Sequence, residues 1–241
     1  MSHRSEFRRV VWTPEFAYAV GLLTADGNLS PDGRHLEICS KDRENVVHFQ
    51  QCLNLQTKLA LKGRGTPPFR TYYRTQCSHV SLYRFLERIG LHPRKSRTIK
   101  AIMVPPRYVA DFLRGVWDGD GGLVTFRHPE SRLTQWKARI SSGSHAFLEW
   151  LRCTIEQRYA IPGKIYRTRH IFQLVYTKRT GSHLLRRMYY HPDVICLSRK
   201  RQQALRLLRS RACGGTGRRA GFRILSREGW GFNSLHAQAF I

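Results

Sequence analysis

The sequence predicts an α+β protein built from two similar halves, each with the order α-β-β-α-β-β-α. The first observation is a repeat, because residues 19–27 and 113–121 are both largely apolar, contain an early glycine and end in Asp-Gly. The second is that strand-like and helix-like patterns follow each repeat in the same order. A repeat period of about half the chain implies two related halves and not a solenoid.

The two repeated stretches are predicted to be the last turns of two helices. Thr13 followed by Pro14 is a helix start signal, so the first helix is expected over 14–25. The second helix follows a Pro-Pro pair at 105–106 and is expected over 107–119.

Four glycines in these stretches need a physical reason. Gly21 and Gly115 each cost a helix roughly 1 kcal/mol relative to alanine. The usual compensation is a close approach of two backbones, so the two helices are expected to pack tightly on each other. Gly27 and Gly121 suit the left-handed residue that follows a helix end.

If the two helices pack in parallel, Asp26 and Asp120 end side by side and form a paired-carboxylate site. A helix C-terminus carries partial negative charge, so unpaired acids there are unfavourable. A divalent cation would offset that cost, and hard cations prefer oxygen ligands.

Each half also has its own predicted strands and helices. In the first half they are a hairpin over 28–39 with a turn at Pro31-Asp32-Gly33, a helix from Asp42, strands at 58–64 and 70–76, and a helix over 80–89. In the second half they are a hairpin with its tip at 126–134, a helix over 144–159, strands at 163–169 and 171–176, a helix over 181–190, and a basic closing segment at 196–204. Residues 210–241 are rich in glycine and arginine without an apolar period, and we interpret them as a flexible basic tail.

Period-two alternation gathers polar side chains on one face of several strands. The pattern gives two groups: Arg70, Tyr72, Arg74 and Gln76 share one face in the first half, and Gln135, Lys137 and Arg139 share one in the second. The opposite face of the second strand is apolar and consists of Trp136, Ala138 and Ile140. This pattern is typical of a strand with one solvent-exposed and one buried face.

The charge of the chain points to a polyanion partner. The formal net charge is +26, from 42 Lys+Arg against 16 Asp+Glu, and the pI is about 10.9. Nucleic acid fits better than membrane, because no apolar run approaches the ~20 residues of a spanning helix. The polar N-terminus is no secretory signal. Six scattered cysteines without a Cys-x-x-Cys pair favour reduced thiols in an intracellular compartment, either a bacterial cytoplasm or an organelle.

Both repeated stretches resemble the LAGLIDADG motif of homing endonucleases, in the single-chain form with two motifs. The first departs from the motif at Thr24, where the family often has an acid, and the second departs at Arg114 and Trp117. The segment 90–98 also resembles the end of the family's first half. The resemblance covers about residues 10–208 and implies two pseudo-symmetric units at 10–104 and 105–209, with the tail at 210–241. It implies one monomer shaped as a DNA-binding saddle, with a sheet under each half.

The resemblance implies an enzyme that makes metal-dependent double-strand cuts in DNA at a long recognition site. Asp26 and Asp120 would hold Mg²⁺, and the carbonyls of Ala25 and Gly119 would assist. The basic residues near the scissile phosphates would be Lys95 and Lys200. Asp118 is expected to be structural, because it lies off the helix face of Asp120. The residues expected to bind DNA are Lys62, Arg64, Arg70, Tyr72, Arg74, Gln76, Gln135, Lys137, Arg139, Arg167 and Arg169.

Two other functions remain open on the same fold. One is an intron RNA maturase, which binds RNA and helps its host intron to fold. The other is a DNA-binding regulator that does not cut. Asp26 and Asp120 favour the nuclease, because binding alone does not need them.

Overall fold

A computed structural model describes residues 10–64, 70–127, 129, 134–169 and 171–209. The first half contains α1 (Pro14–Asp26), β1 (Gly27–Leu29), β2 (His35–Ser40), α2 (Arg43–Cys52), β3 (Ala60–Arg64), β4 (Arg70–Ser78), α3 (Val80–Arg88) and the 3-10 turn η1 (Lys95–Arg97). The second half contains η2 (Pro106–Tyr108), α4 (Val109–Asp120), β5 (Gly121–Arg127), β6 (Thr134–Ser142), α5 (His145–Tyr159), β7 (Lys164–Arg167), β8 (Phe172–Tyr176), α6 (Lys178–Met188) and α7 (Ser198–Arg209). The predicted order α-β-β-α-β-β-α is present twice, and α7 is an additional helix. The hairpin tip at 128 and 130–133 and the tail at 210–241 lie outside the described residues.

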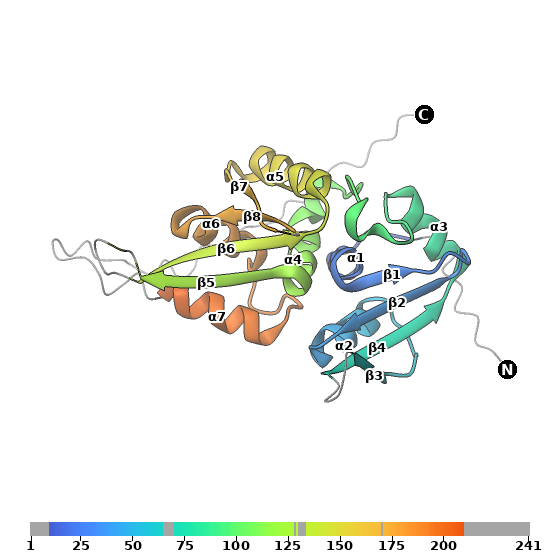
Figure 1. Ribbon diagram of the computed structural model, residues 1–241. Helices are drawn as coiled ribbons and strands as arrows, with labels where there is room; N and C mark the ends of the chain where they lie inside the picture. The colour runs from blue at the N-terminus through green and yellow to red at the C-terminus, as the bar shows by residue number, and fades with distance from the viewer. Residues whose placement is uncertain (1–9, 65–69, 128, 130–133, 170, 210–241) are drawn as a thin grey trace, which may run out of the picture.

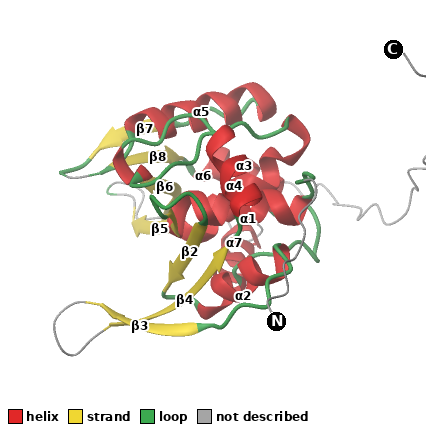
Figure 2. Ribbon diagram, turned by 90° about the vertical axis from the view of Figure 1, so that its right-hand side faces the viewer, coloured by secondary structure: helices red, strands yellow, loops and turns green. Residues whose placement is uncertain are grey.

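The strands form two antiparallel four-stranded sheets, one in each half. Sheet A has the order β1-β2-β4-β3, and sheet B has the equivalent order β5-β6-β8-β7. The pair α1 and α4 lies between the sheets (Figure 1), and most helices lie on one side of them (Figure 2). The chain is therefore α+β, as the sequence predicts. None of the described helices is long and apolar enough to cross a membrane.

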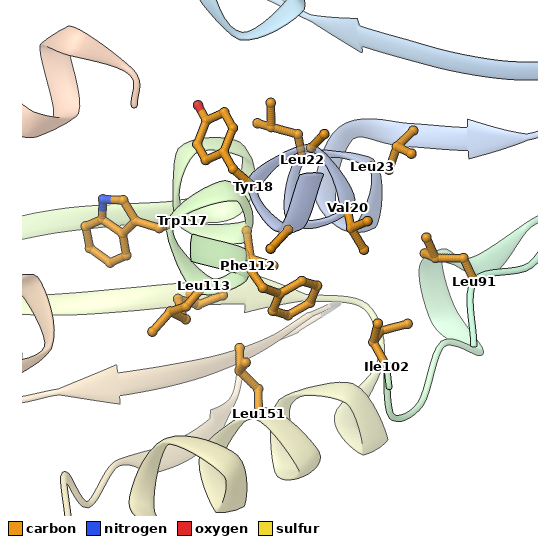
Figure 3. Packing of buried hydrophobic residues seen from close by; sticks show 14 of the residues in the cluster. Tyr18, Val20, Leu22, Leu23, Leu91, Ile102, Phe112, Leu113, Trp117 and Leu151 are labelled. Carbon is orange, nitrogen blue, oxygen red and sulfur yellow. The ribbon is translucent and has the colours of Figure 1, made fainter. Parts of the chain in front are cut away.

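Helix α1 begins as its sequence indicates and forms the centre of the core. The Thr13 side chain accepts a hydrogen bond from the Phe16 N–H at 3.0 Å, which satisfies one of the free N–H groups of the first turn. Tyr18, Val20, Leu22 and Leu23 of α1 and Phe112, Leu113 and Trp117 of α4 belong to one buried hydrophobic cluster around the interface of the two helices (Figure 3). Burial of such side chains is the main stabilising term of the interface.

The two helices approach so closely that Gly21 and Gly115 leave no room for a side chain. A Cβ on Gly21 would lie 2.2 Å from the Phe112 carbonyl oxygen, and a Cβ on Gly115 would lie 2.1 Å from the Tyr18 carbonyl oxygen. Both neighbours are backbone atoms that a rotamer change cannot move. The close packing predicted from the paired glycines is confirmed.

The prediction for the glycines after the helices is wrong in one respect. Gly27 has φ −95° and Gly121 has φ −85°, so both are extended and neither is left-handed. The reason is that a strand begins directly at each of these residues. Glycine is still needed for space, because a Cβ would lie 2.5 Å from a side-chain carbon of Leu23 at Gly27, and equally close to Trp117 at Gly121.

The register of the sheets separates one polar face from one buried face. In β4, Thr75 and Cys77 are buried and Gln76 is exposed. In β6, Trp136, Ala138 and Ile140 are buried, while the alternate residues stay accessible. The predicted alternation is thus confirmed for β6 and for residues 74–77 of β4, where the polar faces are turned away from the core, while the side chain of Arg70 lies outside the described residues.

Each half closes with a segment that docks on the other half. At one end, Arg199 donates from Nε to Asp42 Oδ1 at 2.7 Å, and the Ser198 N–H donates to Glu44 Oε2 at 3.1 Å. At the other end, Ser144 Oγ donates to the Ile99 carbonyl at 2.5 Å. The first contact joins the start of α7 to the start of α2, and the second joins the segment after η1 to the start of α5. We call them the two closing contacts.

Candidate functional site

Asp26 and Asp120 end α1 and α4 at the same end of the helix pair. The helices run in parallel, because their closest residues advance together, from Gly21 against Gly115 to Ala25 against Gly119. A Cβ on Gly119 would lie 3.5 Å from Asp26 Cγ and 2.3 Å from Ala25 Cβ. The sequence expectation that parallel helices bring the two acids together therefore agrees with the structure.

Both carboxylates are held in an environment that opposes their charge. Burial raises the pKa of Asp26, although a hydrogen bond from Ser40 and the nearby lysines partly offset the shift. Burial, followed by repulsion from Asp26, raises the pKa of Asp120 to about 7. The side chain of Asp120 still reaches solvent, which leaves it able to meet a ligand. Lys95 and Lys200 offset the cost of the two charges only in part, so a bound cation would stabilise the ionised pair further.

The two expected catalytic lysines, Lys95 and Lys200, reach the ends of the same helices but are deeply buried. Lys95 Nζ donates to the carbonyl of Gly27, and Lys200 Nζ donates to the equivalent carbonyl of Gly121 at 2.7 Å. Burial lowers the pKa of each lysine to about 8, and the neighbouring acids limit the fall. The two ammonium groups thus occupy equivalent places in the two halves.

Lys200 also completes the C-terminus of α4. Its ammonium group donates to the carbonyls of Trp117 at 2.7 Å, Asp118 at 2.8 Å and Gly119 at 3.2 Å. The last carbonyls of a helix have no partners within the helix and carry partial negative charge, so a cation there is stabilising. This structural role was not predicted, because the sequence does not indicate that α7 would bring Lys200 under α4.

Two hollows open at the carboxylates, one for each acid. A cavity of about 300 Å³ is lined in part by Thr24, Lys95 and Asp120. A second cavity of about 270 Å³ is lined in part by Asp26, Glu37 and Lys62. The Thr24 hydroxyl donates to the carbonyl of Val20 at 2.8 Å, so it is used within α1. Each carboxylate therefore has its own accessible space.

The donors at this site suit a hard divalent cation such as Mg²⁺. Asp26 and Asp120 supply anionic oxygens, and burial raises the pKa of both although Lys95 and Lys200 are nearby. Within the described ranges, no group of three or more His, Cys, Asp or Glu could hold a metal. A cation would therefore complete its shell with backbone carbonyls, water or ligand oxygens, and the Gly119 carbonyl is already in contact with Lys200.

Asp118 faces the interior, as expected, and does not belong to this site. Its Oδ2 accepts hydrogen bonds from the Tyr18 hydroxyl at 2.8 Å and from the Leu197 N–H at 2.7 Å. Burial raises its pKa to about 6. Asp118 therefore joins α1, α4 and the segment before α7.

Most of the predicted DNA-binding residues lie on the polar faces of the sheets. In sheet A, Gln76 pairs with Glu37, and Lys62 pairs with Tyr72 beside Arg74. In sheet B, Gln135, Lys137 and Arg139 alternate with the buried residues of β6. Arg64 and Arg70 pair at the outer end of sheet A, and their side chains lie outside the described residues.

Two predicted residues of sheet B lie elsewhere. Arg167 pairs with Phe172 on the opposite face from Arg139, and its guanidinium carbon lies 6.0 Å from the Phe172 ring centroid. Arg169 lies beyond the end of β7 in an exposed bend. The face shared with Arg139 carries Lys164 and Tyr166 instead. The sequence pattern did not determine the face of Arg167, because a strand register shifted by one residue exchanges the two faces.

Comparison with known proteins identifies the fold. No protein-family model matches the sequence, and no curated protein matches it. Full-length DUF199/WhiA from Thermatoga maritima is similar with a TM-score of 0.56 and 14% identity over 86% of this chain and 64% of that chain. This chain thus spans less than two thirds of that protein.

Two DNA-bound structures are similar over nearly their full length. The homing endonuclease I-WcaI bound to its DNA recognition sequence gives a TM-score of 0.57 and 10% identity, over 85% of this chain and 94% of that chain. I-DmoI in complex with DNA and Mn gives a TM-score of 0.50 and 19% identity, over 74% and 98%. The N-terminal LAGLIDADG domain of DUF199/WhiA is also similar, with a TM-score of 0.52 and 13% identity over 76% and 85%. At these identities the likeness shows the fold.

Proposed function

From the LAGLIDADG fold of this chain, we propose that it is a site-specific homing endonuclease that cuts both strands of DNA at a long recognition site. The observation that carries the proposal is the pair Asp26 and Asp120 at the ends of two helices packed through glycines, between two sheets with polar faces. A protein that only bound nucleic acid would have no need for two carboxylates of raised pKa beside each other.

In this proposal the two acids and the two lysines have different roles near the scissile phosphates. Asp26 and Asp120 would hold Mg²⁺, with help from the Ala25 and Gly119 carbonyls. The bound ion would supply charge relief on the phosphate and an activated water. Lys95 lines the same cavity as Asp120, where its ammonium group stabilises negative charge on the phosphate. Lys200 holds the end of α4, and with it the backbone that leads into Asp120.

The polar faces of the sheets supply the DNA interface. Arg74, Gln76, Gln135 and Arg139 have side chains that pair with base edges in a major groove. Because the net charge is +26, binding to phosphates is strong and depends steeply on salt. The protein acts as one monomer, since both halves of the site are present in one chain.

A second candidate is a nucleic-acid-binding protein that does not cut, either a DNA-binding protein or an intron RNA maturase. The observation that favours it is the position of Lys200, whose ammonium group contacts the Gly119 carbonyl at 3.2 Å. That carbonyl is one of the four groups assigned to the metal, two carboxylates and two carbonyls, and its contact with a cation weakens the ligand set.

Incubation with a library of randomised duplex DNA, in Mg²⁺ and in EDTA, followed by sequencing of new ends, tests the proposal. Nuclease activity predicts paired ends on both strands that need the metal and are absent with Asp26→Asn and with Asp120→Asn. Asp193→Asn is the matched control, because Asp193 is 85% exposed and distant from the helix ends in sequence. Tight binding without new ends would exclude the nuclease, and a comparison of duplex DNA with RNA would then separate the two binding functions.

A further inference from the structure

Sheet A carries an acid at the middle of its polar face. Glu37 in β2 pairs with Asn28 in β1 on one side and with Gln76 in β4 on the other. No motif or periodicity in the sequence marks Glu37, and the excess of positive charge points to the basic residues instead. An acid in this position is unfavourable on a surface that binds phosphates, so it needs an explanation.

The carboxylate of Glu37 lies between two of the expected DNA-binding residues. Its Oε1 is 3.4 Å from Lys62 Nζ, and its Oε2 is 3.4 Å from Arg74 Nη1. The side chains are 21% exposed for Glu37, 42% for Lys62 and 36% for Arg74. Glu37 is therefore the more enclosed partner, while both cations stay accessible to a ligand.

Stability does not account for this arrangement. Ion pairs between partly exposed side chains contribute little to folding, and both hydrogen bonds to Glu37 are long at 3.4 Å. Glu37 also lines the 270 Å³ cavity with Asp26, so the cluster lies next to the proposed cleavage site. This position suggests a role in binding near the cut.

We propose that Glu37 is a specificity-determining residue that directs Arg74 to a base edge and away from the phosphates. This inference rests on the proposed binding of duplex DNA. Arginine has five donors, and one nitrogen held by Glu37 leaves the others free for a bidentate contact with guanine. The carboxylate repels a phosphate that approaches Arg74 or Lys62. The cluster therefore selects a guanine close to the cut and binds unrelated sequences weakly.

Among its described residues, sheet B has no acid on its polar face that corresponds to Glu37. Its polar face carries Lys137, whose ammonium group lies 5.0 Å from the Phe126 ring centroid, with Gln135 and Arg139 on the same strand. Without an acid beside them, these cations are free to contact phosphates. The binding affinity should thus depend more strongly on base-pair identity in the half-site that contacts sheet A than in the half-site that contacts sheet B.

Glu37→Gln tests the proposal, with Glu87→Gln as the matched control. Glu87 is exposed on α3, so its replacement changes the net charge equally without touching the polar face of sheet A. Binding to a 30-base-pair duplex of random sequence is measured by fluorescence anisotropy over a range of salt. Loss of the carboxylate frees Lys62 and Arg74 to contact two more phosphates. The slope of log binding constant against log salt concentration should therefore steepen by about 2, and the affinity for this duplex at low salt should rise several-fold. Glu87→Gln should leave the slope unchanged.

Selection of bound sequences from a randomised duplex library gives the second readout. The native protein should enrich guanine at one position near the centre of the site, and Glu37→Gln should lose this preference while the outer positions persist. Arg74→Lys, which keeps the charge, should lose it too. An unchanged slope together with an unchanged preference would overturn the role of Glu37. Failure of the native protein to bind any duplex is a different result, which would overturn the proposed function itself.

Discussion

Replacement of Gly21 by alanine should destabilise the protein, although alanine is the better helix former. The new methyl group would lie 2.2 Å from the Phe112 carbonyl oxygen, 2.8 Å from the Val116 nitrogen and 2.9 Å from the Gly115 Cα. All three neighbours are backbone atoms of α4, so relief requires the two helices to move apart.

The magnitude follows from two opposing terms. Helix propensity favours alanine by about 1 kcal/mol. Overpacking costs about 1–3 kcal/mol, and the upper end applies because no flexible side chain can give way. The net loss in free energy of unfolding is about 2 kcal/mol, which corresponds to a fall in Tm of roughly 4–8 °C for a chain of this size.

Thermal unfolding followed by circular dichroism measures the effect, with Gly122→Ala as the control. A Cβ on Gly122 meets nothing within 4 Å, so the same chemical change there should shift Tm by no more than about 2 °C. Equal or greater stability of Gly21→Ala would refute the reasoning, because it would mean that the close contact between the helices is not needed.

Three further outcomes are expected. Lys200→Met should lower the free energy of unfolding by about 2–4 kcal/mol, because three carbonyls at the end of α4 and the Gly121 carbonyl after it lose the ammonium group whose three N–H donors they share. Urea unfolding measures this loss, and a value under about 1 kcal/mol would contradict the capping role. Asp118 has a pKa of about 6 in the folded protein, above its unfolded value, so its contribution to stability falls as pH rises from about 4 to about 6. Asp118→Asn should therefore flatten the dependence of urea stability on pH in that range, and parallel curves for the two proteins would argue against the shift. Cys77 and Cys196 are buried, and burial raises the pKa of each thiol to about 11. Mass spectrometry should therefore find both thiols unmodified by iodoacetamide at pH 8 until urea is added, and rapid labelling of the folded protein would be inconsistent with that burial.

Local signals in the sequence predicted the central helix pair well. Thr13 and Pro14 set the start of α1, and the glycines at equivalent places in the repeat predicted the close contact. The conformation of Gly27 was not predicted correctly, because pairing of β1 with β2 extends the chain where Asp-Gly alone favours a left-handed turn. A long-range constraint had overridden a local preference.

The parts of the site that the sequence missed depend on residues far apart in the chain. Lys200 contacts the end of α4, which lies about 80 residues earlier in the sequence, and nothing near Lys200 in the sequence indicates that contact. The face on which Arg167 lies depends on the register between β7 and β8, which an irregular apolar pattern does not determine. Glu37 is notable only once Lys62 and Arg74 are seen beside it.

The two closing contacts bear on how such a protein can be recombined with its relatives. Asp42 and Arg199 belong to different halves, as do Ile99 and Ser144. A hybrid made by joining residues 1–104 to the second half of another protein would keep one member of each pair and lose the other. Halves of this chain are therefore not interchangeable parts by themselves, and a working hybrid must carry both members of each pair across the junction.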